Sequence, residues 1–143
     1  KFVASGAVGA IQISANNGSN WSSGSSGTST NTLYGITFGN NKFFSVGNSG
    51  KLIISSDNGS TFSNLTSPVT KNIYSVAFGN NIFVGVGYRT VVVSNNDGST
   101  VTEKENNLTF NDVTFGNGVF AAVGDDEKIY TSTDGDTWTK VYP

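Results

Sequence analysis

The sequence contains no cysteine, no histidine and no methionine, and Arg89 is its single arginine. Without cysteine, the chain has neither disulfides nor thiol nucleophiles. Without histidine, it also lacks imidazole for acid–base chemistry and the nitrogen and sulfur ligands that zinc and copper prefer. We therefore expect no bound cofactor and no transition-metal site.

Charge is also scarce, since only 13% of the residues are charged and the net charge is −2. Nucleic-acid surfaces need clustered Lys and Arg, so we expect no nucleic-acid partner. No segment approaches the roughly 20 apolar residues of a membrane span, so we expect no membrane insertion. The polar content is mainly Ser, Thr, Asn and Gly, a composition that favours an extracellular or cell-surface protein. The chain opens on Lys1 rather than Met, which indicates a piece of a longer protein.

What the sequence does contain is a repeat of about 40 residues. A phenylalanine-led motif ending in Gly recurs as FVASG, FFSVG, FVGVG and FAAVG at 2–6, 43–47, 83–87 and 120–124. A Phe-Gly-Asn motif occurs at 38–40, 78–80 and 115–117. A third motif, rich in Ser, Asx and Gly, occurs at 14–21, 55–62, 94–101 and 132–138.

Each repeat holds four short apolar runs separated by Gly and Asn. In the third repeat they lie at 72–78, 82–87, 90–94 and 99–104, and we refer to such runs in order as strands A to D. Four strands in about 40 residues are typical of a propeller blade. The sequence thus predicts a single all-β propeller domain or propeller segment of four-stranded antiparallel blades. The predicted blades span about 1–31, 32–71, 72–107 and 108–143, and the first lacks its innermost strand, A.

Side-chain alternation on strand A supports this prediction. Tyr34, Ile36 and Phe38 would share one face, and small residues such as Gly35 lie between them. Small side chains are what an innermost strand needs where blades converge.

The Ser-Asx-Gly motif falls between strands C and D and is therefore expected to form a hairpin turn. Its Asx side chain can accept hydrogen bonds from turn amides, and its glycine can supply positive φ. The residue that closes the motif should begin strand D and be buried between blades. In chain order, the Asx residues are Asn16, Asp57, Asn96 and Asp134, the glycines are Gly18, Gly59, Gly98 and Gly135, and the closing residues are Trp21, Phe62, Val101 and Trp138.

The pattern Ser-x-Asp-x-Gly-x-Thr-Trp is the Asp-box, and the four copies resemble it over essentially the whole chain. With the phenylalanine-led strand and the Phe-Gly-Asn turn, the sequence is similar to the Asp-box propellers. These include sialidases, xyloglucan-cleaving glycosidases and the photosystem II assembly-factor family. The copies depart from the pattern in three ways: Asn16 and Asn96 replace Asp, the fourth copy is one residue short, and Val101 replaces the aromatic residue.

In an up-and-down blade the A–B and C–D turns lie on one face of the propeller. The regular motifs fall in these turns, so we expect them to have a structural role. The B–C and D–A loops lie on the opposite face and vary between repeats, so we expect function there. The candidate binding residues are Asn48, Tyr88, Arg89, Asp112, Asp125, Asp126 and Glu127. Tyr88 and Arg89 could stack on and hydrogen-bond a ligand, or Arg89 could pair with an acid across the rim. The acids at 125–127 could form half a calcium site or simply a solvated loop.

Catalytic alternatives are limited by the same composition. A sialidase needs an arginine cluster, which one arginine cannot provide. A glycoside hydrolase needs two carboxylates about 5–10 Å apart, and Asp112 with one of the 125–127 acids is the pairing that the sequence offers.

We therefore expect a non-catalytic binding or scaffold module that recognises a protein or a glycan. The alternatives are a glycoside hydrolase-like propeller fragment and an assembly factor of the photosystem II type. Because the first repeat lacks strand A, we also expect either further blades from a longer chain or self-association of copies.

Overall fold

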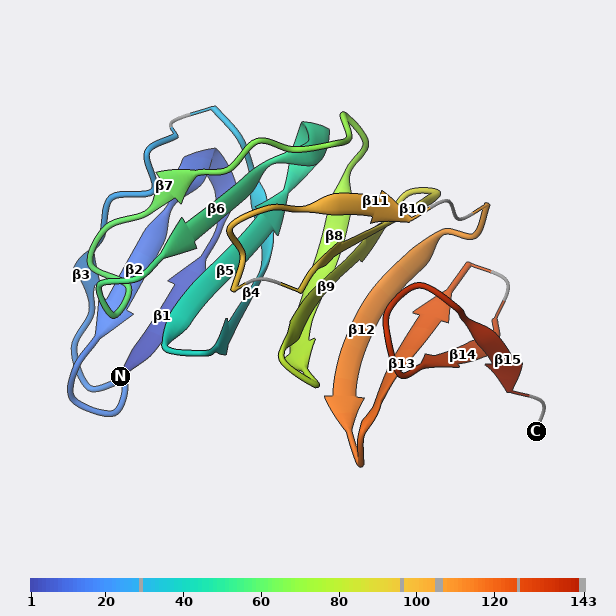
Figure 1. Cartoon of the computed structure of the whole chain (residues 1–143). Coiled ribbons are helices and arrows are strands. Elements are labelled where there is room, and N and C mark those ends of the chain that lie inside the picture. The colour runs from blue at the N-terminus through green and yellow to red at the C-terminus, as the bar shows by residue number, and fades with distance from the viewer. Residues whose placement is uncertain (29, 96, 105–106, 126, 142–143) are drawn as a thin grey trace.

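The computed structural model describes all residues except 29, 96, 105–106, 126 and 142–143. The described residues form four antiparallel sheets that lie side by side in chain order (Figure 1). We call them blades 1 to 4. The all-β blade architecture predicted from the repeat is confirmed, and the first sheet has three strands whereas the other three have four.

Blade 1 contains β1 (Phe2–Ser5), β2 (Ile11–Ser14) and β3 (Ser22–Ser23). Blade 2 contains β4 (Leu33–Gly39), β5 (Lys42–Gly47), β6 (Leu52–Ser55) and β7 (Ser63–Asn64). Blade 3 contains β8 (Ile73–Gly79), β9 (Ile82–Gly87), β10 (Thr90–Ser94) and β11 (Thr102–Lys104). Blade 4 contains β12 (Phe110–Gly116), β13 (Val119–Gly124), β14 (Ile129–Ser132) and β15 (Thr139–Val141).

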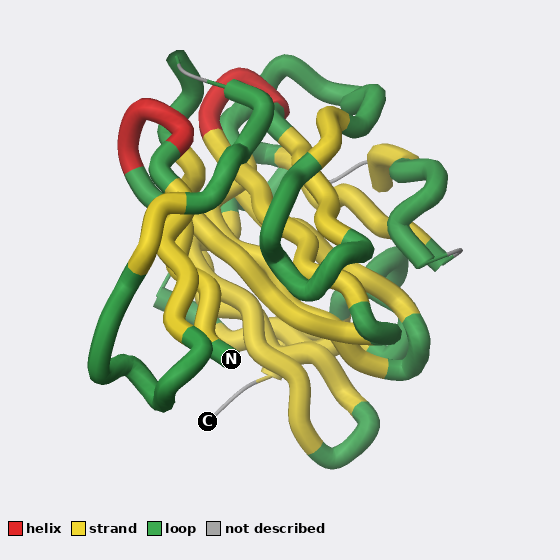
Figure 2. The backbone as a smooth tube through the Cα atoms, turned by 90° about the vertical axis from the view of Figure 1, so that its left-hand side faces the viewer, coloured by secondary structure: helices red, strands yellow, loops and turns green. Residues whose placement is uncertain are grey.

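Each blade runs in strict strand order, so that every strand pairs with the one that follows it in sequence. Two short 3-10 turns, η1 (Ala7–Gly9) and η2 (Asn48–Gly50), connect strands B and C in blades 1 and 2. Both turns lie at the same end of the strands (Figure 2). The outermost strand is shorter than the sequence suggested, because β11 begins at Thr102 rather than at residue 99.

The core is divided into three apolar layers, one at each junction between successive blades. Phe44 and Val46 of blade 2 pack with Phe83 and Val92 of blade 3 in the middle layer. Blades 1 and 2 share the first layer, and blades 3 and 4 share the third. Blades 2 and 3 therefore bury their two faces against two different neighbours, which explains why their strands are apolar on both faces.

Strand A contains an irregularity that the alternation did not predict. The pairing of β4 with β5 shifts between Leu33 and Gly35, so Tyr34 lies in a bulge. The same shift occurs between Ile73 and Ser75 and between Phe110 and Asp112. A bulge redirects the side chain of the extra residue, so the predicted face shared by Tyr34, Ile36 and Phe38 is not continuous.

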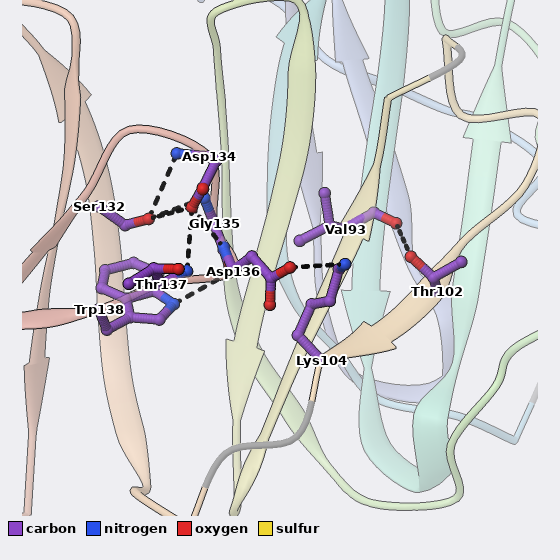
Figure 3. Close-up of polar contacts among 9 residues, drawn as sticks. All are labelled: Val93, Thr102, Lys104, Ser132, Asp134, Gly135, Asp136, Thr137 and Trp138. Carbon is purple, nitrogen blue, oxygen red and sulfur yellow. Dashed lines mark hydrogen bonds and ion pairs between the residues drawn. The ribbon is translucent and has the colours of Figure 1, made fainter.

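The hairpin turns between strands C and D form the hydrogen bonds that their sequence requires, and we call them the Ser-Asx turns (14–21, 55–62, 94–101 and 132–138). In the fourth, Asp134 Oδ1 accepts hydrogen bonds from the backbone N–H groups of Asp136 at 2.9 Å and Thr137 at 3.0 Å (Figure 3). Ser132 Oγ accepts from Gly135 N at 2.8 Å, and Trp138 Nε1 donates to the Gly135 carbonyl at 3.0 Å. Asn96 lies outside the described residues.

These turns also join neighbouring blades. Gly98 of blade 3 lies so close to Phe44 and Ile54 of blade 2 that a Cβ atom there would approach Ile54 to 2.4 Å. Gly59 lies against Val3 of blade 1, and Gly135 lies against Val84 and Val93 of blade 3. Each of these three turns thus sits on the preceding blade. Their glycines have φ between 74° and 80°, so both conformation and space select glycine.

The closing residues of the turns behave as predicted in three blades. Phe62 is buried, and Val101 and Trp138 pack against their layers. Trp21 is the exception, with 47% of its surface exposed. The expectation that Trp21 is buried between blades is wrong for this structure, because the described sheets leave that face of blade 1 uncovered.

Candidate functional site

The B–C and D–A loops lie together at one end of the blades, and we call this end the loop face. A repeated backbone bond holds them: Asn48 N donates to Thr32 O at 3.0 Å, and Tyr88 N donates to Asn72 O at 3.0 Å. Asp125 N makes the corresponding bond to Thr109 O at 3.3 Å. The opposite end carries the A–B turns and the Ser-Asx turns, where Asn80 Nδ2 donates to Thr133 O at 3.0 Å. The separation of variable loops from regular turns therefore follows from the pairing of the strands.

The three bulged positions of strand A place Tyr34, Tyr74 and Asn111 at the loop-face end of the innermost strands. The rings of Tyr34 and Tyr74 meet edge to face, with centroids 5.9 Å apart and an interplanar angle of 63°. Tyr34 remains 45% exposed and Tyr74 is half-buried. The two tyrosines thus form an aromatic surface that spans two blades and is open to solvent.

Sequence reasoning did not single out these tyrosines as site residues. It grouped Tyr34 with Ile36 and Phe38 on a packed face, whereas the bulge separates Tyr34 from that face. A usable signal was nevertheless present: a large apolar residue, then Tyr, then a small residue, as in Leu33-Tyr34-Gly35 and Ile73-Tyr74-Ser75. The residue triplet alone does not specify a bulge, so the signal is clear only once the register is known.

Tyr88 and Arg89 lie on the B–C turn of blade 3, and both are exposed. The Arg89 carbonyl accepts a hydrogen bond from Lys71 Nζ at 3.0 Å, and Lys71 Nζ also contacts Glu103 Oε1 at 2.9 Å. Glu103, the acid across the rim, is therefore paired with Lys71. The Arg89 guanidinium makes no ion pair with any residue that the structure describes.

Asn48 was predicted as a binding residue, and its side chain organises the loop face. Its Oδ1 accepts hydrogen bonds from Asn31 Nδ2 and from Thr32 N, both at 3.0 Å. These bonds tie the D–A loop that enters blade 2 to the B–C turn of the same blade. A ligand would have to break them to use the Asn48 carbonyl oxygen.

Asp112 lies directly after the bulge on β12, at the position that Gly35 and Ser75 occupy in the neighbouring blades. Its Oδ1 accepts a hydrogen bond from Ser75 Oγ at 2.6 Å and another from Val113 N at 2.9 Å. The carboxylate therefore links the innermost strands of blades 3 and 4, and its side chain is exposed. Asp112 thus lies on the innermost strand of blade 4 with Ser75 as its side-chain partner, and its role as a binding residue stays a prediction.

The acidic turn of blade 4 is only partly described, because Asp126 lies outside the described residues. Asp125 Oδ1 accepts a hydrogen bond from Asn111 Nδ2 at 2.7 Å, and Glu127 is exposed with φ of 59°. Among the described residues, no three acidic side chains come together in a group that could hold a metal ion. The bond to Asp125 instead fixes the third bulged residue, Asn111, at the edge of the tyrosine surface.

Comparison with known proteins places the chain in a structural class. No protein-family model and no curated protein matches the sequence. Among solved structures, the chain is similar to YCF48 bound to D1 peptide, with a TM-score of 0.75 and 15% identity over 96% of this chain and 48% of that one. It is also similar to an ancestral GH74 enzyme, with a TM-score of 0.73 and 22% identity over 99% of this chain and 22% of that one.

A third similar structure is the nidogen/laminin complex, with a TM-score of 0.70 and 12% identity over 94% of this chain and 56% of that one. The fold is therefore that of consecutive β-propeller blades. The chain spans about half the length of the YCF48 chain and less than a quarter of the GH74 chain. At these identities the likeness shows the fold alone. No described helix is long and apolar enough to cross a membrane.

Proposed function

We propose that this chain is a non-catalytic binding module that recognises an extended segment of a partner protein on the loop face. The observation that carries the proposal is the Tyr34–Tyr74 pair, an aromatic surface on the innermost strands β4 and β8 that is open to solvent. Tyrosine contributes a large amphipathic contact area and, with arginine, is enriched at protein-binding hot spots. Tyr88 and Arg89 supply a third aromatic ring and a forked donor at the same end of blade 3.

The hydrogen bonds around this surface support a recognition role. The bulges and the Ser75–Asp112 bond fix the innermost strands, and the Asn48 bonds hold the loops around them. A preorganised surface loses little conformational entropy when it binds. Similar propellers include one described as bound to a peptide and one described in a protein complex, and both descriptions agree with a protein partner.

The Ser-Asx turns are proposed to be Asp-boxes, and their hydrogen bonds at Asp57 and Asp134 support this. The proposed setting is outside the cell or on its surface, a proposal supported by the Ser, Thr, Asn and Gly content. Protease treatment of intact cells carrying the native protein would test the setting, with resistance to digestion contradicting it.

The binding experiment begins with selection of peptides from a display library on the wild-type chain. Binding of a selected peptide is then measured by fluorescence anisotropy for the wild type, Tyr34→Ala and Tyr74→Ala. We expect each change to weaken binding at least about tenfold, as loss of a hot-spot aromatic residue does. The matched control is Asn117→Ala, an exposed residue on the opposite face, which should leave binding unchanged.

A glycan array probed with the same chain distinguishes the other ligand class. Specific glycan binding that depends on Tyr34 and Tyr74, without peptide enrichment, would contradict a protein partner. The rival enzymatic function, a glycoside hydrolase that uses Asp112, has the GH74 likeness in its favour. In this structure, however, the carboxylate is hydrogen-bonded to Ser75 and Val113.

A further inference from the structure

The outer face of blade 4 carries a row of exposed apolar side chains. Val123 pairs across the sheet with Ile129, and Ile129 pairs with Val141. Their exposed fractions are 47%, 50% and 42%. A row of three such residues on adjacent strands forms one continuous apolar patch.

The equivalent positions in the other blades show what this face normally contacts. Val86 and Val91 of blade 3 occupy the same places as Val123 and Ile129, and both are fully buried. They lie in the layer that blade 4 covers with Phe110 and Phe120. The patch on blade 4 is therefore the surface against which another blade would pack.

Blade 1 carries the complementary surface on its opposite side. Phe2 is 51% exposed, whereas Phe83 and Phe120, its equivalents in blades 3 and 4, are buried against the preceding blade. Trp21 on the same side is half exposed, and its equivalent Trp138 packs against the apolar layer between blades 3 and 4. Phe2 and Trp21 are thus the aromatic residues that would cover a patch such as that of blade 4.

At these two surfaces, residues whose equivalents contact a neighbouring blade make no such contact. Asn40 Nδ2 donates to Asp97 Oδ1 of the next blade, and Asn80 Nδ2 donates to Gly118 O and Thr133 O of the next blade. The side chain of Asn117, the equivalent residue in blade 4, makes no such bond with the described residues and is exposed. A Cβ atom built on Gly18 of blade 1 would meet nothing within 4 Å, whereas Gly59, Gly98 and Gly135 each lie against the preceding blade.

We propose that the blade 4 face of one copy binds the blade 1 face of a second copy, and that two such contacts close a ring of two chains. The contact resembles the outer part of the junctions within the chain, with Phe2 and Trp21 of one copy on Val123 and Ile129 of the other. Blade 1 contributes its three described strands to it, whereas blades 2 to 4 also pack through their innermost strands β4, β8 and β12. Two chains contribute eight blades, which lies within the usual range of about four to eight for propellers. A head-to-tail contact that closes by a twofold rotation satisfies both faces of both copies.

The first test is the mass of the purified chain by sedimentation equilibrium at about 10–100 µM, the range in which a moderately tight dimer is populated. The expected mass is twice the chain mass of 14.9 kDa. Ile129→Lys and Phe2→Lys should each give the single-chain mass, because each places a charge in one of the two faces. The control Val8→Lys changes an exposed apolar residue outside both faces and should keep the double mass.

Mixing the two interface variants tests the head-to-tail geometry. The Phe2→Lys chain retains an intact blade 4 face and the Ile129→Lys chain retains an intact blade 1 face. A mixed pair therefore has one wild-type contact and one contact that carries both lysines, so the mixture should contain more dimer than either variant alone but less than the wild type. Circular dichroism of each variant checks that the blades remain folded. A single-chain mass for the wild type would overturn the proposal, as would a Phe2→Lys variant that still dimerises or a mass that rises through larger multiples.

Discussion

Asp57 and Thr61 are joined by both the backbone and the side chain of the threonine. Thr61 Oγ1 donates to Asp57 Oδ2 at 2.6 Å, and Thr61 N donates to Asp57 Oδ1 at 2.9 Å. Together with a bond from Ser55 Oγ at 2.7 Å, they stabilise the ionised carboxylate. They therefore hold the pKa of Asp57 well below its ordinary value of 3.8. Backbone bonds from Thr137 and Asp136 lower the pKa of Asp134 in the same way.

These two aspartates should make stability depend on pH in the acid range. Because their pKa values are lower in the folded state, their contribution is fully present above the unfolded value of 3.8 and is lost as the pH falls below it. We expect the melting temperature to fall between pH 5 and pH 2.5, and to fall less for the Asp57→Asn/Asp134→Asn double variant. Thermal melts at several pH values measure this, and equal falls in both proteins would contradict it.

Gly98 allows a test of how the Ser-Asx turns dock on the preceding blade. Gly98→Ala would place a Cβ atom 2.4 Å from Ile54 in addition to straining a φ of 79°. Gly18→Ala is the matched control, because its φ is 87° and its Cβ atom would meet nothing within 4 Å. We expect the control to cost about 1 kcal/mol of unfolding free energy, and Gly98→Ala to cost about 2–4 kcal/mol.

Urea denaturation at neutral pH compares the two glycine variants. Equal losses would mean that the turn can move away from blade 2 without cost, which would contradict the docking.

Val8 is a β-branched residue in the left-handed region, with φ of 55°, and it is 68% exposed. Asn tolerates this conformation far better than Val, so Val8→Asn should stabilise the chain by about 1 kcal/mol. Ser49 occupies the equivalent place in blade 2 with φ of 51°, and Ser49→Asn should give a smaller gain because Ser is not β-branched. The midpoint of urea denaturation measures both changes, and a loss of stability in Val8→Asn would refute the strain argument.

Substitution of Asp112 distinguishes the proposed binding module from a glycoside hydrolase. Asp112→Asn keeps an oxygen that can accept hydrogen bonds from Ser75 and Val113, so fold and peptide binding should change little. A glycoside hydrolase that used this carboxylate would lose its turnover by several orders of magnitude. Release of reducing sugar from xyloglucan, measured for both proteins, is expected to be absent. Turnover by the wild type that disappears in Asp112→Asn would establish the enzyme instead.

The repeat made much of the fold predictable, because its signals are local. Strands at 82–87 and 90–94 were placed to the residue, since Gly and Asn delimit them and their apolar residues must be buried. The Ser-Asx turns were predictable for the same reason: Asp134 bonds to amides only two and three residues away.

The site was less predictable, because its features depend on distant partners. Tyr34 is exposed because of a register shift against β5, and no local pattern specifies that shift. The Asn48 side chain bonds to Asn31 and Thr32, which only the pairing of β4 with β5 brings near. The exposure of Trp21 depends on whether another sheet covers blade 1, a property of the assembly rather than of the turn.

The docking of each Ser-Asx turn on the preceding blade gives the molecule a direction. Gly59, Gly98 and Gly135 each pack against the blade that precedes their own in sequence. A blade is therefore covered on that face only after the next blade has folded. Nearest-neighbour coupling of this kind makes repeat folding a propagating process. During synthesis one face of a newly made blade therefore stays exposed to solvent until about 40 further residues, the length of one repeat, have left the ribosome.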